Sequence, residues 1–243
     1  TLLNEEEKEF FCKLGIFSGW FDANIAAHVC EATPSKTTAL LNSLTDHSLL
    51  VRESLKGKVH WRMLELIHEY AVSKLTDEQR SHVELLRAEH YISLLQRLND
   101  STETQRTEFF HMHISNLNSA MKWTIASRRT DLGYQLSGFL DDSWSAHGYF
   151  KEGLALMREL LSLPYEGEPA IRAERLQDAS DLSWQQHDFE TAIAYCKEAA
   201  ELGRKFGLKG RYSAYINRLG RIYIEQGRFT EAKQALQEVL DLA

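Results

Sequence analysis

The chain has 243 residues, 43% of them hydrophobic and 26% charged, which is a typical composition for a globular protein with two cores. No apolar run is long enough to span a membrane and no signal-peptide pattern is present, so we predict a cytoplasmic protein without a membrane partner. The net charge of −7 argues against nucleic acid as the main partner, because phosphate contacts need Lys and Arg. The cysteines, at positions 12, 30 and 196, fit no metal or redox spacing.

Residues 1–75 show three helix signals followed by a hairpin signal. Each helix begins at a capping signal, namely Asn4 with Glu7, Asp22, and Thr33 before Pro34. An apolar strand at 49–51, a turn at Lys56-Gly57-Lys58 and a second strand at 59–63 indicate a hairpin. Three helices and a hairpin are the order of a winged helix, and we predict this domain over residues 1–75.

The second strand runs directly into a helix. Between residues 59 and 63 apolar and polar side chains alternate, and from Leu64 the period changes, with Leu64, Ile67, Ala71 and Leu75 on one helical face. We predict an interdomain hinge at this joint, formed by Trp61, Arg62, Met63, Leu64 and Glu65.

Everything after this joint is predicted to be helical. Residues 76–130 show two long amphipathic helices separated by Asn99–Thr102, and we interpret them as a helical connector. Residues 131–243 are internally repetitive. Three similar turns recur 39 and then 40 residues apart, each followed by an aromatic and, three residues later, a small residue: Gly148-Tyr149-Phe150, His187-Asp188-Phe189 and Gly227-Arg228-Phe229. They predict three stacked helical hairpins.

The last hairpin resembles a tetratricopeptide repeat. The residues that carry the resemblance are Leu219-Gly220, Tyr223, Phe229, Ala232 and Leu236. The period of 39 to 40 residues exceeds the 34 or so that are usual in that family. The expected fold is therefore mostly α, with a winged helix followed by a tetratricopeptide-like superhelix.

The whole chain also resembles the region after the nucleotide-binding core of STAND (NB-ARC-like) signal-transduction ATPases, including bacterial transcription regulators. The motifs that carry this resemblance are Leu14–Phe21, Leu44–Leu50, Trp61–Glu65 and Asn116-Leu117 with Trp123. It implies a winged helix that packs on the chain's own nucleotide-binding core, which would hold ADP or ATP, and repeats that bind a signal ligand or protein. Related proteins contact nucleotide through the His of a Met-His-Asp motif. Here Met63-Leu64-Glu65 stands at that place, so this contact is not carried over.

The tetratricopeptide pattern also predicts which residues line the concave groove. They are Gln177, Asp181 and Trp184 in the second hairpin and Asn217, Arg221 and Ile224 in the third. Trp184 is either an anchor for a partner or a core residue, whereas we expect Trp144, its counterpart, to be core. We interpret Arg218 and Arg221 as a solvated face in preference to a site for an acidic group.

No catalytic or metal-binding constellation is present in the sequence. The GxxxxGK[ST] phosphate loop is missing and no catalytic triad or paired carboxylates can be defined, so we expect no enzymatic activity, no cofactor and no metal in this chain. One alternative is a DNA-binding winged helix with a repeat-based oligomerisation arm. Residues 1–75 hold 8 Lys and Arg against 10 Asp and Glu, and the third helix offers only Lys36, so DNA binding is disfavoured. A second alternative is a peptide-binding tetratricopeptide scaffold.

Overall fold

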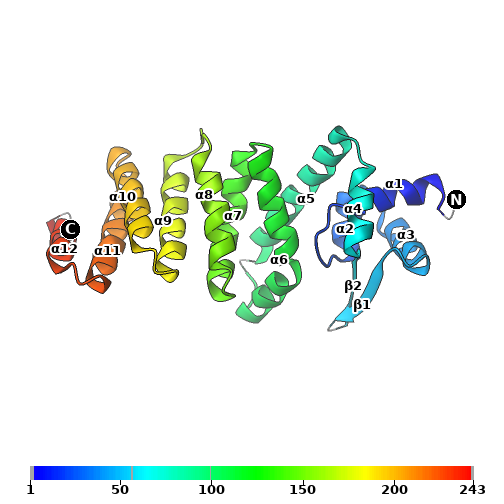
Figure 1. Ribbon diagram of the computed structural model, residues 1–243, viewed down its shortest axis with the longest axis horizontal. Helices are drawn as coiled ribbons and strands as arrows, with labels where there is room; N and C mark the ends of the chain where they lie inside the picture. Colours follow the sequence, from blue (N-terminus) through cyan, green and yellow to red (C-terminus); the bar gives the residue numbers. More distant parts are fainter. Residues whose placement is uncertain (1–2, 56, 99, 242–243) are drawn as a thin grey trace. The chain divides into compact units, whose positions relative to one another are not determined.

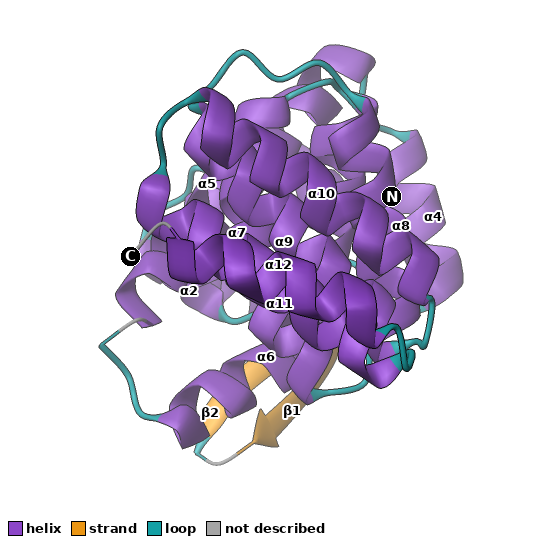
Figure 2. Cartoon of the chain, turned by 90° about the vertical axis from the view of Figure 1, so that its left-hand side faces the viewer, coloured by secondary structure: helices purple, strands orange, loops and turns teal. Residues whose placement is uncertain are grey.

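The computed structural model describes residues 3–55, 57–98 and 100–241, and it divides the chain into two compact units, 1–124 and 125–243. The described part is mostly helical, and its strands form one two-stranded sheet (Figures 1 and 2). The predicted mostly-α fold class is thereby confirmed. Within the described residues, no helix is long and apolar enough to cross a membrane.

The first unit begins with the expected winged-helix order. Its elements are α1 (Glu5–Leu14), α2 (Ala23–Val29), α3 (Pro34–Asp46), β1 (Val51–Leu55), β2 (Lys58–Arg62) and α4 (Glu65–Ser73). The capping box is present, because the Asn4 side chain accepts from Glu7 N and Glu7 accepts from Asn4 N, both at 2.9 Å. Asp22 caps α2 through Asn24 N and Ile25 N, whereas the Thr33 side chain makes no capping hydrogen bond.

The hairpin starts later than the sequence predicts. The first strand was expected at 49–51, but β1 covers Val51–Leu55 and pairs antiparallel with β2 from Val51–Arg62 to Leu55–Lys58. Leu50 is 4% exposed, so the apolar run 49–51 mainly marks a buried turn. Trp61 of β2 also forms an antiparallel β-bridge with Phe21. Trp61 N donates to Phe21 O at 2.8 Å, and Phe21 N donates to Trp61 O at 2.9 Å.

The strand-to-helix joint is present, but Leu64 is not on the inward face. Trp61 and Met63 are 4% and 8% exposed, whereas Leu64 is 46% exposed. The prediction for Leu64 is wrong because α4 begins one residue later. Leu64 is its N-cap with an extended backbone, at φ −75° and ψ 151°, so its side chain does not share the helical face of Ile67 and Ala71.

Two long helices, α5 (Asp77–Leu98) and α6 (Glu103–Ala126), complete the first unit and confirm the predicted helix pair. Side chains of both helices form hydrogen bonds with the backbone of the segment that follows α1, residues 16–20. Arg87 of α5, fully buried, donates to Ile16 O at 2.5 Å. Asn116 of α6 accepts from Gly19 N at 3.2 Å and donates to Trp20 O at 2.8 Å. The predicted winged helix and most of the connector therefore form one compact unit.

One buried and one half-buried histidine of this unit have lowered pKa values. Burial lowers the pKa of His113, which is 4% exposed, to about 4. Burial lowers the pKa of His90 to about 4 as well, and the charge of His28 lowers it further. The two imidazole rings are stacked, with their centroids 4.2 Å apart. In the unfolded chain these groups titrate near 6.5. The folded state therefore keeps both imidazoles neutral, while the unfolded state binds their protons first.

We predict that the first unit is stable above pH 6.5 and loses stability as the pH falls from there toward 4. The lowered pKa of His113 alone corresponds to a loss of about 3 kcal/mol of unfolding free energy as the pH falls from 6.5 to 4. Urea titrations at neutral and acidic pH measure this loss. His113→Gln should flatten the pH dependence. An unchanged slope in the His113 variant would refute the assignment.

The second unit consists of the three predicted hairpins. They are α7 (Thr130–Ala146) with α8 (Phe150–Ser162), α9 (Pro169–Gln185) with α10 (Phe189–Lys205), and α11 (Lys209–Glu225) with α12 (Phe229–Asp241). The small residue that lies three positions after each aromatic is buried, at Gly153, Ala192 and Ala232. A Cβ at Gly153 would lie 2.6 Å from the Trp144 ring, so the small residue does permit close helix packing.

Each hairpin turn contains one residue in the left-handed backbone region. These residues, Gly148, His187 and Gly227, occupy the same place in the repeat, with φ of 76°, 59° and 71°. We predict that Gly227→Ala costs about 1 kcal/mol of unfolding free energy, because the space is open but the backbone disfavours a Cβ. Gly210→Ala, also in open space but inside α11, should instead stabilise by a similar amount. Thermal unfolding of both variants checks the opposite signs.

Candidate functional site

The six residues predicted to line the groove lie on two helices of the second unit. Gln177, Asp181 and Trp184 project from α9 and are half-buried. Asn217, Arg221 and Ile224 project from α11 and are exposed, with Ile224 46% exposed. The structure thus places a semi-buried polar row on one helix and an accessible row on the other.

Asp181 is the centre of the semi-buried row. It accepts from Gln177 Nε2 at 3.0 Å and pairs with Arg218 Nη2 of α11 at 2.6 Å. Burial raises the pKa of this carboxyl, while the Arg218 guanidinium and the Gln177 hydrogen bond partly offset the rise. The Arg218 guanidinium also lies 5.8 Å from the Trp184 ring centroid. A half-buried, hydrogen-bonded pair of this kind joins α9 to α11.

Two further contacts join α9 to α11 on either side of Asp181. Glu174 pairs with Arg211 at 2.7 Å, and Trp184 Nε1 donates to the Glu225 carboxylate. Arg211, Arg218 and Glu225 were not predicted as groove residues. The sequence held a signal for these contacts, because the two acidic residues on α9 and the two basic residues on α11 have the same spacing. Glu174 and Asp181 are seven residues, or two turns, apart, and so are Arg211 and Arg218.

Both tryptophans can now be placed. Trp144 is fully buried, so its prediction as a core residue is confirmed. Trp184 is half-buried and packs against the cluster of Ile193, Leu219 and Tyr223, and its indole N–H is already engaged. The interpretation of Arg218 as a solvated residue is wrong, because its side chain is only 24% exposed in the pair with Asp181. Arg221 is exposed, as expected.

The accessible row defines what this surface can do chemically. Asn217, Arg221 and Ile224 lie at i, i+4 and i+7, so they share one face of α11. Together they offer an amide, a cation without a carboxylate partner among the described residues, and an apolar side chain. Such a face suits a polypeptide with an acidic and an apolar side chain one turn apart.

Comparison with known proteins gives a family for the repeats. Residues 175–243 match the tetratricopeptide repeat, so the prediction of these repeats is confirmed over that range. Tetratricopeptide repeats generally mediate protein interactions and are not catalytic. The curated relatives that match include a protein of Mycobacterium bovis and one from each of two strains of Mycobacterium tuberculosis, all provisionally named HTH-type transcriptional regulators.

Each of these relatives is 27% identical over 193 residues, which cover 75% of this chain and 22% of the relative. The matched region is thus about a fifth of their length. Among solved structures, a STAND protein with a tetratricopeptide repeat sensor from Pyrococcus horikoshii aligns with 99% of this chain and 44% of its own, at 16% identity and a TM-score of 0.35.

Proposed function

We propose that the chain is the non-catalytic regulatory and sensor module of a STAND-type signalling ATPase. Its winged helix packs on a nucleotide-binding core that holds ADP or ATP, and its repeats bind a signal ligand or protein. The observation that carries this proposal is the order of the parts, namely a winged helix, a long helix pair and tetratricopeptide repeats in one chain. The provisional names of the mycobacterial relatives support a role in transcription regulation. We place the module in the cytoplasm.

The proposed signal site is the groove face of α9 and α11. Asn217, Arg221 and Ile224 would contact the partner, because they are exposed. Gln177, Asp181 and Trp184 would hold α11 in place, because their polar groups are already hydrogen-bonded within the unit. A peptide-binding scaffold without an ATPase would use the same face and remains the second alternative.

The proposed hinge, Trp61 to Glu65, has a mechanical role. Trp61 and Met63 are anchored in the core of the winged helix, and the Arg62 guanidinium lies 5.0 Å from the Trp20 ring centroid. The Glu65 side chain is exposed at the start of α4. A movement of α4 would therefore reach the hairpin through two buried side chains.

Binding of DNA is the first alternative, and the structure of α3 disfavours it. Lys36, the only Lys or Arg on α3, is paired with Glu6 of α1. A recognition helix needs cations or amides toward the bases and a basic rim toward the phosphates. Band-shift titration with mixed-sequence duplex at low salt tests this. We expect no shift, and binding that strengthens as salt falls would favour the DNA-binding alternative.

The proposed function predicts binding to the nucleotide-binding core of the full-length protein. Calorimetry with the separately expressed core should show a 1:1 complex. Arg221→Glu with Ile224→Asp, in the groove, should leave that complex intact, because these residues serve the signal. Absence of a complex when both parts are folded would overturn the proposal.

A further inference from the structure

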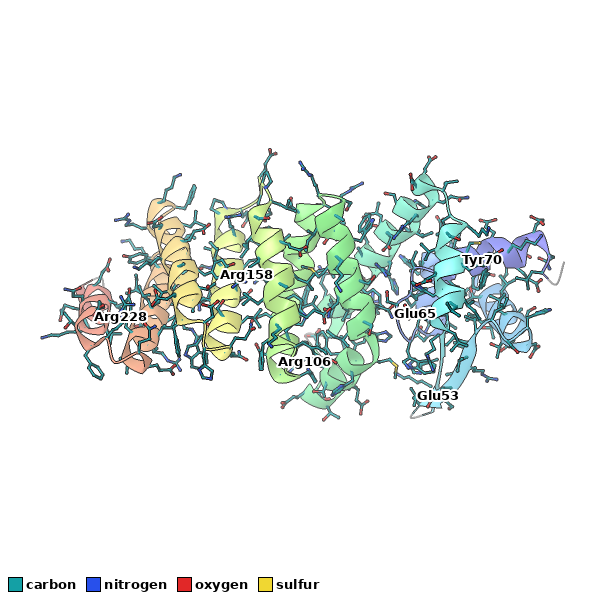
Figure 3. All side chains as sticks on the ribbon, in the orientation of Figure 1. Glu53, Glu65, Tyr70, Arg106, Arg158 and Arg228 are labelled. Carbon is teal, nitrogen blue, oxygen red and sulfur yellow. The ribbon has the colours of Figure 1, made fainter. Side chains whose placement is uncertain are left out.

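Helix α4 is apolar on two faces, and only one of them is covered in the described chain. Ala71 is fully buried against the rest of the winged helix, while Leu66 and Tyr70 are 80% and 57% exposed. Leu66 and Tyr70 lie one turn apart, and Figure 3 shows Tyr70 projecting from α4. Exposed apolar side chains that gather in one patch are typical of an interaction site.

The uncovered face of α4 forms one wall of an apolar groove of about 580 Å³. The other wall is α1, through Phe11 and Cys12, and Leu49 lies between the walls. The Tyr70 and Phe11 rings are 6.4 Å apart between centroids. The lining is aliphatic and aromatic apart from the thiol and two lysine side chains, so an apolar occupant is favoured.

The charges around the groove restrict that occupant further. Lys8 is neutralised by Glu5 at 2.6 Å. Lys74 has no carboxylate partner among the described residues, and its ammonium lies 4.7 Å from the Tyr70 ring centroid. Leu66 and Tyr70 of α4 and Lys74, its C-cap, follow one another at four-residue steps. A complementary segment carries two apolar side chains one turn apart and then a carboxylate.

We infer that the groove between α1 and α4 is a docking site for an amphipathic helix with that pattern, contributed by the nucleotide-binding core. The inference rests on the proposed function, since the core is the partner that it assigns to the winged helix. Leu66 and Tyr70 supply the apolar contact, and Lys74 sets the direction of the docked helix by pairing with its carboxylate.

Two fluorescent helical peptides of about 18 residues test the chemistry of the groove. Both carry leucines at i and i+4, and one has glutamates after them where the other has lysines. By fluorescence anisotropy, we expect the glutamate peptide to bind about tenfold more tightly than the lysine peptide. Lys74→Glu should reverse this preference. Leu66→Asp should weaken the glutamate peptide about tenfold or more, while Leu240→Asp, equally solvent-facing on α12, should not.

Circular dichroism confirms that each variant is folded. No binding of either peptide, or equal binding of both, would overturn the inference. Self-association of the chain that Leu66→Asp abolishes would also overturn it, since a second copy would then be the occupant. Calorimetry with the core separates the two claims. A core that binds wild type and Leu66→Asp equally refutes the groove alone. A core that binds neither refutes the proposed function and the core as occupant, and binding of the glutamate peptide would then support only the chemistry of the groove.

Discussion

Arg87→Ala is expected to destabilise the first unit by about 3–5 kcal/mol, the largest effect of a single side-chain truncation in this chain. The Arg87 side chain is fully buried and makes three contacts, to Ile16 O, to Ser119 Oγ at 3.2 Å, and to the Glu84 carboxylate. Burial raises the pKa of Glu84 and lowers that of Arg87, and the charge of each partner opposes the shift of the other. Truncation leaves a buried carboxylate and a buried carbonyl without a partner.

Chemical denaturation measures this effect against two comparisons. Arg97→Ala, on the exposed side of the same helix, should cost less than about 0.5 kcal/mol. The double variant Arg87→Met with Glu84→Leu should recover much of the loss, because no unpaired charge remains. A single Arg87→Ala variant that is as stable as wild type would contradict this account of how α5 holds the link after α1.

Gly15→Ala is expected to cost on the order of 2 kcal/mol or more, because α1 and α4 touch at this position. An added Cβ would lie 2.8 Å from Ala71 Cβ and 2.9 Å from Val72 N, and the backbone nitrogen cannot move without α4. The backbone of Gly15 is right-handed, at φ −60°, so the effect is steric and not conformational.

A double-mutant cycle identifies the clash. Ala71→Gly alone should cost about 1 kcal/mol as a glycine inside a helix. Combined with Gly15→Ala, it removes the nearer of the two contacts, so the double variant should be more stable than the sum of the single effects by about 1 kcal/mol. Simple additivity in urea denaturation would show that the two helices do not meet through these atoms.

The helices were predictable because their signals are local. Capping at Asn4 and Asp22 and the aromatic-plus-small pattern of the repeats each lie within a few residues of the feature they predict. The prediction of the first strand failed because Leu50 is apolar for burial in a turn, whereas β1 itself carries exposed Arg52 and Glu53. Hydrophobicity reports burial, and strand pairing has to be inferred separately.

Contacts between distant segments could not be predicted in the same way. Arg87 is a charged residue inside an amphipathic helix, and its partners at Ile16 and Ser119 lie 71 and 32 residues away in the sequence. Asn116 was singled out as part of a resemblance, and the structure adds the physical reason, which is its hold on the backbone of Gly19 and Trp20.

The candidate groove shows the same limit. The repeat pattern predicted that Asp181 lines the groove, but it did not predict the ion pair of Asp181 with Arg218. The pattern describes each hairpin and not the contacts between neighbouring hairpins. A side chain at a lining position can therefore already be hydrogen-bonded within the protein, as Trp184 is to Glu225. This is why the exposed row on α11 is the better candidate for a partner.

The release of a fluorescent ADP analogue from the nucleotide-binding core tests the central claim most directly. We predict that saturating amounts of this chain slow the release by about tenfold, because in the proposed function the winged helix packs on the core and would hold it closed around ADP. Leu66→Asp should abolish the slowing, and Leu240→Asp should preserve it. An unchanged release rate, with both partners folded and the chain in saturating excess, would contradict the assignment of this chain as the regulatory module of a signalling ATPase.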